Sequence, residues 1–142
     1  MALNLRAPFL TAKAFAGGMK RRRWGRIVNI ASGAGRSYSR SRVIPYAAAK
    51  AGLLGFTRQL AVDLAPYGVN VNAVSPGIIE TPGMKEANWG GVPSPKQLRE
   101  VNRSIPLGRL GYSREVAEAI VWLSLESSSY ITGTILPVAG GR

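Results

Sequence analysis

The sequence predicts an α/β fold in which helices cover a parallel β-sheet. Two short runs, residues 26–31 and 69–74, are rich in β-branched residues, as strands buried on both faces of a parallel sheet are. They alternate with longer segments, 2–16 and 45–65, in which apolar residues recur at near-helical spacing. Alternation of apolar strands with helices is typical of layered α/β domains.

The first elements follow from this pattern. A helix over 2–16 is expected to end at the glycine pair 17–18, because adjacent glycines favour a helix stop. The strand over 26–31 leads into a polar loop, residues 32–43, that is rich in Arg and Ser. The helix over 45–65 opens with a proline, which is tolerated at the first helical position.

The second half of the chain is expected to be less regular. The pair Pro-Gly at 76–77 breaks the second strand, and a loop rich in Gly, Pro and Trp follows over 78–93. A capping box at 94–97 predicts a short helix. Ser113 is expected to cap another helix, with Val116, Ile120 and Leu123 on one face, and a last strand is expected over 134–138. Three strands are few for an open sheet.

The composition excludes several classes of chemistry. The chain has 142 residues, which predicts a single domain over residues 1–142, and it contains no Cys and no His. A disulfide framework, a thiol nucleophile, a catalytic imidazole and a zinc site of the usual ligands are therefore excluded. With one Asp and six scattered Glu, no metal site is expected either. Any chemistry must use hydroxyls, amines, amides and a borrowed cofactor.

The charge of +12 is concentrated between residues 20 and 42. Such a cluster could meet phosphates or an acidic surface. These cations are not regularly interleaved with aromatic residues, however, so a solvated Arg-rich surface is the favoured interpretation and nucleic acid is not expected as a partner. No stretch approaches the roughly 18 consecutive apolar residues of a membrane span. The N-terminus does not have the pattern of a secretory signal. We therefore expect a cytoplasmic protein.

Tyr46 and Lys50 form the first candidate for chemistry. They place a phenol and an ammonium four residues apart, on one face of the helix over 45–65. An ammonium beside a phenol favours the phenolate, which makes Tyr46 a candidate general acid or base in a chain without histidine. Alone, the spacing is weak evidence, because a tyrosine that packs its ring beside a solvated lysine gives the same pattern.

The position of this pair relative to the strands strengthens the case. Ser32 directly follows the first strand, Tyr46 opens the next helix, and the pair 76–77 ends the second strand. All of them should lie at the carboxyl edge of the sheet, where open α/β folds bind ligands. Asn29 and Ser75, also near strand ends, are expected to hydrogen-bond the backbone.

Four runs of the sequence resemble the C-terminal part of a classical short-chain dehydrogenase/reductase. They are GRIVNIAS (25–32), YAAAKAG (46–52), NVNAVSPGIIETP (70–82) and ITGT (131–134). Their order and separations match the family across almost the whole chain. The resemblance implies a Rossmann-like, doubly wound parallel sheet, NAD or NADP as cofactor, and hydride transfer between the nicotinamide and a secondary alcohol or ketone.

The resemblance also implies a role for each site residue. Tyr46 matches the tyrosine that exchanges a proton with the substrate oxygen, and Lys50 the lysine that supports it and holds the nicotinamide ribose. Ser32 matches the serine that binds the substrate oxygen, and Asn4 the asparagine that positions a water in the proton relay. The loop that contacts the nicotinamide is matched by Pro76, Gly77, Ile79 and Thr81. Pairing of helices between subunits, and hence a homodimer or homotetramer, is implied as well.

Parts of the family pattern have no counterpart. The Gly-rich turn that receives the pyrophosphate is absent, as is the residue that chooses between NAD and NADP. Because the helical pattern is already under way at Met1, the part of the family before Asn4 is expected to be missing, and these 142 residues alone are not expected to turn over substrate. The alternative is a truncated, non-catalytic remnant that acts as an interaction partner. Over 82–110, apolar residues suggest either a substrate pocket or a lid packed on the core: Met84, Trp89, Val92 and Leu98.

Overall fold

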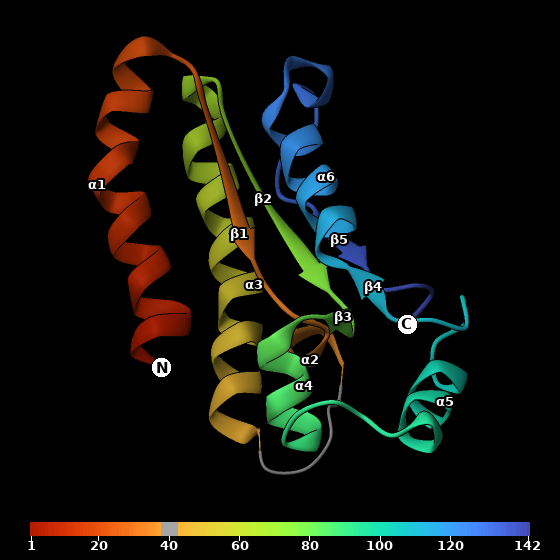
Figure 1. Cartoon of the computed structure of the whole chain (residues 1–142). Coiled ribbons are helices and arrows are strands. Elements are labelled where there is room, and N and C mark those ends of the chain that lie inside the picture. The colour runs from red at the N-terminus through yellow and green to blue at the C-terminus, as the bar shows by residue number, and fades with distance from the viewer. Residues whose placement is uncertain (38–42) are drawn as a thin grey trace.

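A computed structural model describes residues 1–37 and 43–142, and its centre is a three-stranded parallel sheet (Figure 1). The strand order is β1 (Gly25–Ile30), β2 (Val69–Pro76) and β5 (Ile135–Val138). The register of the first pair sets Ile27 opposite Val71. The predicted α/β class with a parallel sheet is confirmed.

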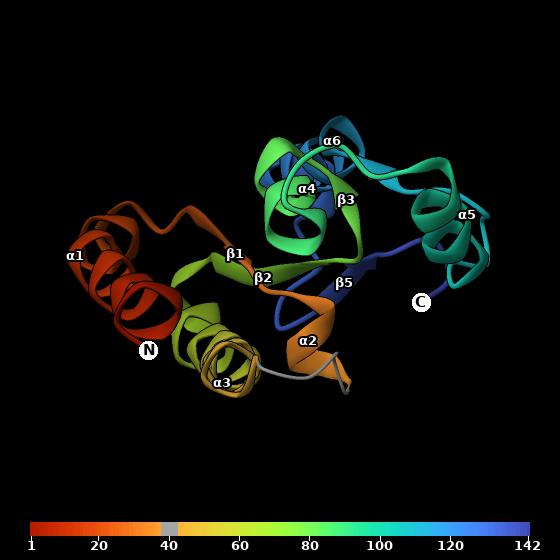
Figure 2. The ribbon, with the colours of Figure 1, turned by 60° about the horizontal axis from the view of Figure 1, so that its bottom comes forward.

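Helices cover both faces of this sheet, as a doubly wound fold requires. α1 (Ala7–Arg22) and α3 (Ile44–Leu64) lie on one face, and α6 (Ser113–Ser124) lies on the other (Figures 1 and 2). The central strand β2 is buried from Val69 to Ser75. Valine alternates with Asn70 and Asn72 over its first four positions, so burial on both faces requires these asparagines to find hydrogen-bond partners.

The first helix is longer than the sequence predicts. It opens with a π-helical turn, Ala2–Arg6, and α1 continues through the glycine pair 17–18 to Arg22. The expected end at these glycines is wrong. The extra turn carries Met19 onto the buried cluster that includes Leu64. Burial of that side chain offsets the roughly 1 kcal/mol that each helical glycine costs.

Two segments that were expected to be loops contain helices. α2 (Gly33–Arg36) follows Ser32, and α4 (Pro82–Trp89) lies within the loop after β2. In both, a side-chain oxygen caps the helix: Ser32 caps α2 and Thr81 caps α4. A threonine followed by a proline at the first helical position is the sequence pattern that predicts α4.

The C-terminal part adds α5 (Pro95–Arg103) and the predicted capping box at its start. The N–H of Ser94 donates to Oε1 of Gln97 at 2.8 Å, and Oγ of Ser94 accepts the N–H of Gln97 at 3.4 Å. The expected cap of α6 is displaced by one residue: Tyr112 holds the cap position. Its N–H donates to the carboxylate of Glu115, so Ser113 belongs to the helix itself.

A second, two-stranded parallel ladder joins β3 (Ile79–Glu80) to β4 (Gly111–Tyr112), which the sequence did not predict. Two residues per strand are too few to produce a recognisable alternation. The ladder fixes the segment after β2 to the start of α6.

Two asparagines of the NVNAV run tie β2 to the segment that leads into β5. The amide of Asn72 donates to the carbonyl of Ile131 at 2.9 Å, and its oxygen accepts the N–H of Thr134 at 3.0 Å. The amide of Asn70 donates to the same carbonyl, at 2.9 Å. These buried side chains replace ladder hydrogen bonds where the backbone cannot supply them.

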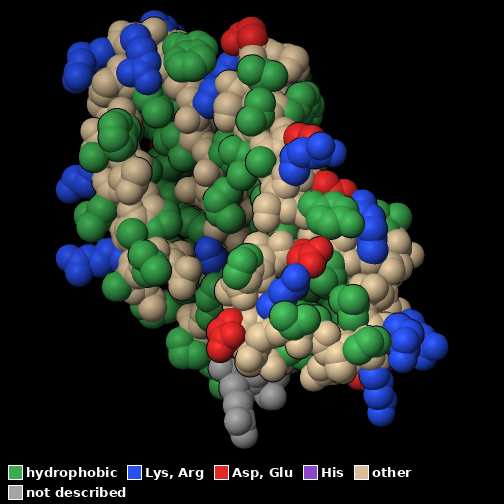
Figure 3. All heavy atoms as spheres, in the orientation of Figure 1, with side chains coloured by type: hydrophobic (Ala, Val, Ile, Leu, Met, Phe, Trp, Pro, Cys, Tyr) green, Lys and Arg blue, Asp and Glu red, His purple; other side chains and the backbone are tan. Residues whose placement is uncertain are grey.

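The surface divides into charged and apolar regions. Figure 3 shows Lys and Arg side chains gathered at the end of the molecule where α1 ends, and hydrophobic side chains exposed along α1. Within residues 1–37 and 43–142, the helices are all too short or too polar to cross a membrane.

Candidate active site

Ser32 lies at the carboxyl edge of the sheet, as predicted. The N–H of Ala31 donates to the carbonyl of Val74 at 2.8 Å, so the pairing of β1 with β2 extends to the residue before Ser32. Oγ of Ser32 accepts the N–H of Ala34 at 3.2 Å. Because the hydroxyl uses a lone pair in this bond, its proton remains available for a ligand oxygen.

Tyr46 and Lys50 project from the first turns of α3 at the same edge. Nζ of Lys50 donates to the carbonyl of Ile30, the last residue of β1, at 2.7 Å. The same ammonium lies 5.7 Å from the centroid of the Tyr46 ring. Partial burial lowers the pKa of Lys50 from its ordinary 10.5, because desolvation disfavours the charged form. Tyr46 is 39% exposed, so its phenol is accessible to a ligand.

Gly35 brings the Ser32 segment against Lys50. A Cβ placed on Gly35 would lie 2.6 Å from the carbonyl carbon of Lys50 and 2.8 Å from the nitrogen of Ala51. α2 can therefore pack directly on the backbone of α3 only because residue 35 has no side chain. This contact joins the element that carries Ser32 to the turn that carries Lys50.

The loop after β2 lies at this edge too. The N–H of Gly77 donates to the carbonyl of Val138 at 2.9 Å, and a Cβ on Gly77 would lie 2.8 Å from Cα of Ala139. The loop is thereby held against the end of β5. Beyond it, Ile79 lies in β3, and Oγ1 of Thr81 accepts the N–H of Met84 at 3.1 Å.

Asn4 lies on the π-helical turn that precedes α1. The neighbouring Leu5 touches Gly52 of α3, because a Cβ on Gly52 would lie 3.1 Å from Cδ2 of Leu5. Gly52 is two residues beyond Lys50, so this turn packs beside the part of α3 that carries Lys50. The Asn4 side chain is half-buried and makes no hydrogen bond to any described residue. π-helical turns occur often at functional sites.

Comparison with known proteins decides the family. A family model described as enoyl-(acyl carrier protein) reductase matches residues 1–142. The chain belongs to the short-chain dehydrogenase/reductase family. It is 42% identical over 139 residues to 3-oxoacyl-(acyl-carrier-protein) reductase FabG of Pseudomonas aeruginosa, an alignment that covers 97% of this chain and 53% of the relative. The chain thus spans about half the length of the curated relatives it matches.

Solved structures of the family share this fold. A 3-oxoacyl-(acyl-carrier protein) reductase from Brucella melitensis, with bound NAD, superposes with a TM-score of 0.85 at 40% identity, covering 98% of this chain and 48% of that one. A gluconate 5-dehydrogenase from Burkholderia cenocepacia, in complex with NADP and tartrate, gives a TM-score of 0.89 at 32% identity, covering 99% and 53%. The predicted Rossmann-like class is confirmed.

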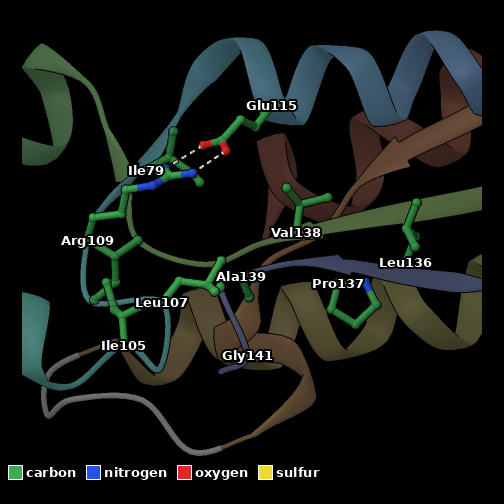
Figure 4. Close-up of a pocket in the computed structure, with 13 residues that line it drawn as sticks. Ile79, Ile105, Leu107, Arg109, Glu115, Leu136, Pro137, Val138, Ala139 and Gly141 are labelled. Carbon is green, nitrogen blue, oxygen red and sulfur yellow. Dashed lines mark hydrogen bonds and ion pairs between the residues drawn. The ribbon is translucent and has the colours of Figure 1, made fainter.

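This family member also has a pocket that sequence reasoning missed. It has a volume of about 330 Å³ and opens between the end of β5, β3 and the segment before β4 (Figure 4). Of the predicted site residues, Ile79 alone lines it; Ser32, Tyr46 and Lys50 lie elsewhere. The pocket therefore lies beside the segment after β2 rather than at Ser32, Tyr46 and Lys50.

An ion pair crosses one side of this pocket. The guanidinium of Arg109 donates to both oxygens of Glu115, at 2.6 and 3.0 Å, and the N–H of Tyr112 adds a third bond at 2.7 Å. These donors hold the pKa of Glu115 down at about 2, the hydrogen bond from Arg109 being the main cause. The sequence signal that could have singled out Glu115 is its place in the first turn of a predicted helix, where an acidic side chain is favoured.

The apolar residues of the 82–110 segment form a small core of their own. Met84, Trp89 and Leu98 pack on the buried cluster Val101, Ile105 and Leu110. Val92 is exposed. Of the two sequence interpretations, the lid packed on a core therefore describes these residues better than a substrate pocket does.

Two polar residues at strand ends differ from expectation. Asn29 was expected to bond the backbone, but its amide donates to Oγ1 of Thr57 at 2.9 Å, and Thr57 in turn donates to the carbonyl of Leu53 at 2.7 Å. Ser75 is fully buried, and its hydroxyl has no partner among the described residues. Nor do those residues contain a group of three or more acidic, His or Cys side chains able to hold a metal ion.

Proposed function

We propose that residues 1–142 form one partial Rossmann-like domain that carries the proton-transferring and nicotinamide-contacting residues of an NAD- or NADP-dependent oxidoreductase. Its reaction would interconvert a secondary alcohol and a ketone. The observation that carries the proposal is the position of Lys50, whose ammonium bonds the end of β1 and lies 5.7 Å from the Tyr46 ring, beside the segment of Ser32. The reductase and dehydrogenase names of the relatives support the same reaction class.

The residues present fit the nicotinamide end of such a cofactor. Lys50 uses one N–H on the carbonyl of Ile30, which leaves two donors for ribose hydroxyls, and the Tyr46 hydroxyl is exposed nearby. Gly77 packs directly against Ala139 at the end of β5, which holds the proposed nicotinamide-contacting loop at this edge of the sheet. The cofactor supplies the hydride. Because no Gly-rich phosphate turn occurs in the sequence, we expect the chain to hold only this end.

The chain's own residues manage the proton. In the direction of reduction, the Tyr46 hydroxyl gives its proton to the carbonyl oxygen that receives the negative charge. The Ser32 hydroxyl, whose proton is not used on Ala34, donates a hydrogen bond to that oxygen. The ammonium of Lys50 stabilises the phenolate left on Tyr46. Asn4 would hold the water that returns a proton to the site.

Exposed apolar side chains support assembly into a symmetric dimer or tetramer as part of this proposal. α1 and the turn before it expose Leu3, Phe9 and Phe15, and Phe9 contacts Phe56 of α3 edge-to-face at 6.0 Å. An apolar surface shared by two long helices is typical of an isologous interface. Sedimentation is expected to show a dimer or tetramer, and a folded monomer at micromolar concentration would contradict this part. Function in the cytoplasm stays a prediction of the sequence.

A chimaera tests the proposed reaction. Residues 1–142 replace the stretch of P. aeruginosa FabG that they match, so that FabG supplies the rest of the protein. We expect the chimaera to oxidise NADH or NADPH in the presence of a ketone, and the 142 residues alone to show no turnover. Tyr46→Phe should lower kcat by about 10²–10⁴-fold with little change in cofactor affinity. Lys50→Met should lower both kcat and cofactor affinity, because Lys50 is proposed to support Tyr46 and to bind the nicotinamide ribose.

The matched control is Tyr130→Phe, which removes a hydroxyl from a fully exposed tyrosine and should leave turnover unchanged. Circular dichroism of each variant shows whether it is folded. A folded chimaera whose Tyr46→Phe variant turns over as fast as the parent contradicts the assignment of Tyr46.

A further inference from the structure

Four consecutive cations lie at the end of the molecule opposite the candidate active site. Lys20, Arg21 and Arg22 form the last turn of α1, and Arg23 follows it, just before β1 begins. Ser32 follows the other end of β1, so the length of the strand separates the two regions. Figure 3 shows Lys and Arg side chains gathered at this end. The proposed reaction uses none of these residues.

Two exposed aromatic rings lie among these cations. Nζ of Lys20 is 4.6 Å from the centroid of the Tyr67 ring, and the guanidinium of Arg22 is 6.0 Å from that of Trp24. Trp24 is 50% exposed and Tyr67 is 38% exposed. The guanidinium of Arg26, on a side chain that is only 6% exposed, lies 5.2 Å from the Trp24 ring. The buried guanidinium of Arg26 thus supports the Trp24 ring, while the exposed Arg22 lies at the limit of cation–π distance from it.

The fold brings the two rings into one surface. A guanidinium nitrogen of Arg23 donates to the carbonyl of Pro66 at 3.0 Å, and Gly68 packs on the carbonyl of Arg23. Tyr67 therefore lies beside the basic run although it is far away in the sequence. We call this surface the basic–aromatic patch: Lys20, Arg21, Arg22, Arg23, Trp24 and Tyr67.

The positive charge of the patch is largely not neutralised by nearby acidic side chains. Glu126 pairs with Arg26 at 2.9 Å, and Asp63 accepts a hydrogen bond from Gln59 at 2.9 Å. Across the described ranges, no ion pair involves a residue from Lys20 to Arg23. The helix dipole favours cations in the last turn, but Arg23 lies beyond that turn, in a left-handed conformation (φ 52°) that favours glycine. Helix stability alone does not explain an arginine there.

We propose that the basic–aromatic patch binds single-stranded nucleic acid, with phosphates on the cations and bases stacked on Trp24 and Tyr67. Positive charge that follows a backbone, combined with exposed rings, is the arrangement that single strands require. An anionic lipid surface could use the same cations and rings, and the vesicle titration below distinguishes it from a single strand. The sequence alone did not predict nucleic acid as a partner, because the basic run has few aromatic neighbours in the sequence. Only the fold places Tyr67 beside these cations.

Fluorescence anisotropy of a labelled oligothymidine, titrated with the 142-residue chain at several salt concentrations, tests the proposal. The triple variant Lys20→Ala, Arg21→Ala, Arg22→Ala should weaken binding at least about tenfold and reduce the salt slope by about 2, near 0.7 for each lost contact. The matched control removes three cations from α5 instead: Lys96→Ala, Arg99→Ala, Arg103→Ala. It has the same net charge and should change affinity by no more than about twofold.

The aromatic variants separate stacking from charge. Trp24→Ala and Tyr67→Ala should each weaken oligothymidine binding about tenfold, whereas Trp24→Phe should retain most of it. Heparin has charge but no bases, so the aromatic variants should bind it as the parent does. Trp122→Ala on α6 is the control for the loss of an exposed indole and should leave oligothymidine binding unchanged. The proposal is overturned if the α5 variant loses as much affinity as the patch variant, or if the aromatic variants bind like the parent. Binding of anionic vesicles with the same dependence on Trp24 would overturn it as well.

Discussion

Replacing Gly35 with alanine should reveal how tightly the Ser32 segment is packed against Lys50. The new Cβ would lie 2.6 Å from one backbone atom of α3 and 2.8 Å from two more, which is well inside the 3.4 Å at which ordinary contact begins. These atoms belong to the backbone of Lys50 and Ala51 and cannot rotate away. α2 must therefore move as a whole, and overpacking of this kind costs about 1–3 kcal/mol.

A smaller term acts in the opposite direction. Alanine restricts the unfolded chain more than glycine does, which stabilises the folded state by up to about 1 kcal/mol where the backbone conformation allows it. The net expectation for Gly35→Ala is a loss of about 1–2 kcal/mol. Gly55→Ala is the matched control, because a Cβ on Gly55, in the middle of α3, meets no atom within 4 Å. It should gain about 0.5–1 kcal/mol.

Urea denaturation followed by circular dichroism measures both free energies of unfolding. Gly35→Ala should be less stable than the parent and Gly55→Ala more stable, so that their unfolding free energies differ by about 1.5–3 kcal/mol. In the FabG chimaera, Gly35→Ala should also lower kcat, because it displaces Ser32 from Lys50, whereas Gly55→Ala should not. If Gly35→Ala were as stable and as active as Gly55→Ala, the direct packing of α2 on α3 would be refuted.

Three further predictions concern stability. Asn72→Ala leaves the half-buried N–H of Thr134 without a partner, whereas the carbonyl of Ile131 keeps its bond from Asn70, and should cost about 1–3 kcal/mol in urea denaturation; a loss under about 0.5 kcal/mol would contradict the role of this asparagine. Gly68→Ala should cost about 1–3 kcal/mol more than Gly90→Ala, because both have positive φ but only Gly68 packs on another backbone; equal losses would contradict this. Since the pKa of Glu115 falls from 4.5 to about 2 on folding, its ion pair stabilises the protein above about pH 4.5 and the contribution is lost as the pH falls toward 2. The difference in unfolding free energy between the parent and Glu115→Gln should shrink across that window, while Glu118→Gln, on an exposed pair, should show little change.

Sequence patterns predicted the elements whose causes are local or strongly periodic. The runs rich in β-branched residues predicted β1 and β2, and the Tyr46–Lys50 spacing predicted two side chains on one helix face, which the structure confirms. The capping box of α5 was predicted because both of its partners lie within four residues. In each case the interaction that stabilises the element joins neighbours in the sequence.

The features that were missed depend on contacts between distant segments. α1 passes its glycine pair because Met19 packs on a cluster from α3 and β2, and β3 exists because it pairs with β4. The bond from Lys50 to Ile30, the packing of Gly35 and the position of Tyr67 beside Arg23 all require the folded chain. Periodicity carries no information about such contacts.

Transfer of an isotopic label tests the central claim most directly. The FabG chimaera that contains residues 1–142 is given a ketone and reduced cofactor deuterated at the nicotinamide carbon that donates hydride, and the alcohol product is analysed by mass spectrometry. Our account predicts deuterium on the carbinol carbon, at a rate that Tyr46→Phe lowers by about 10²–10⁴-fold. An alcohol without the label, or a rate of label transfer that is independent of Tyr46, would contradict it.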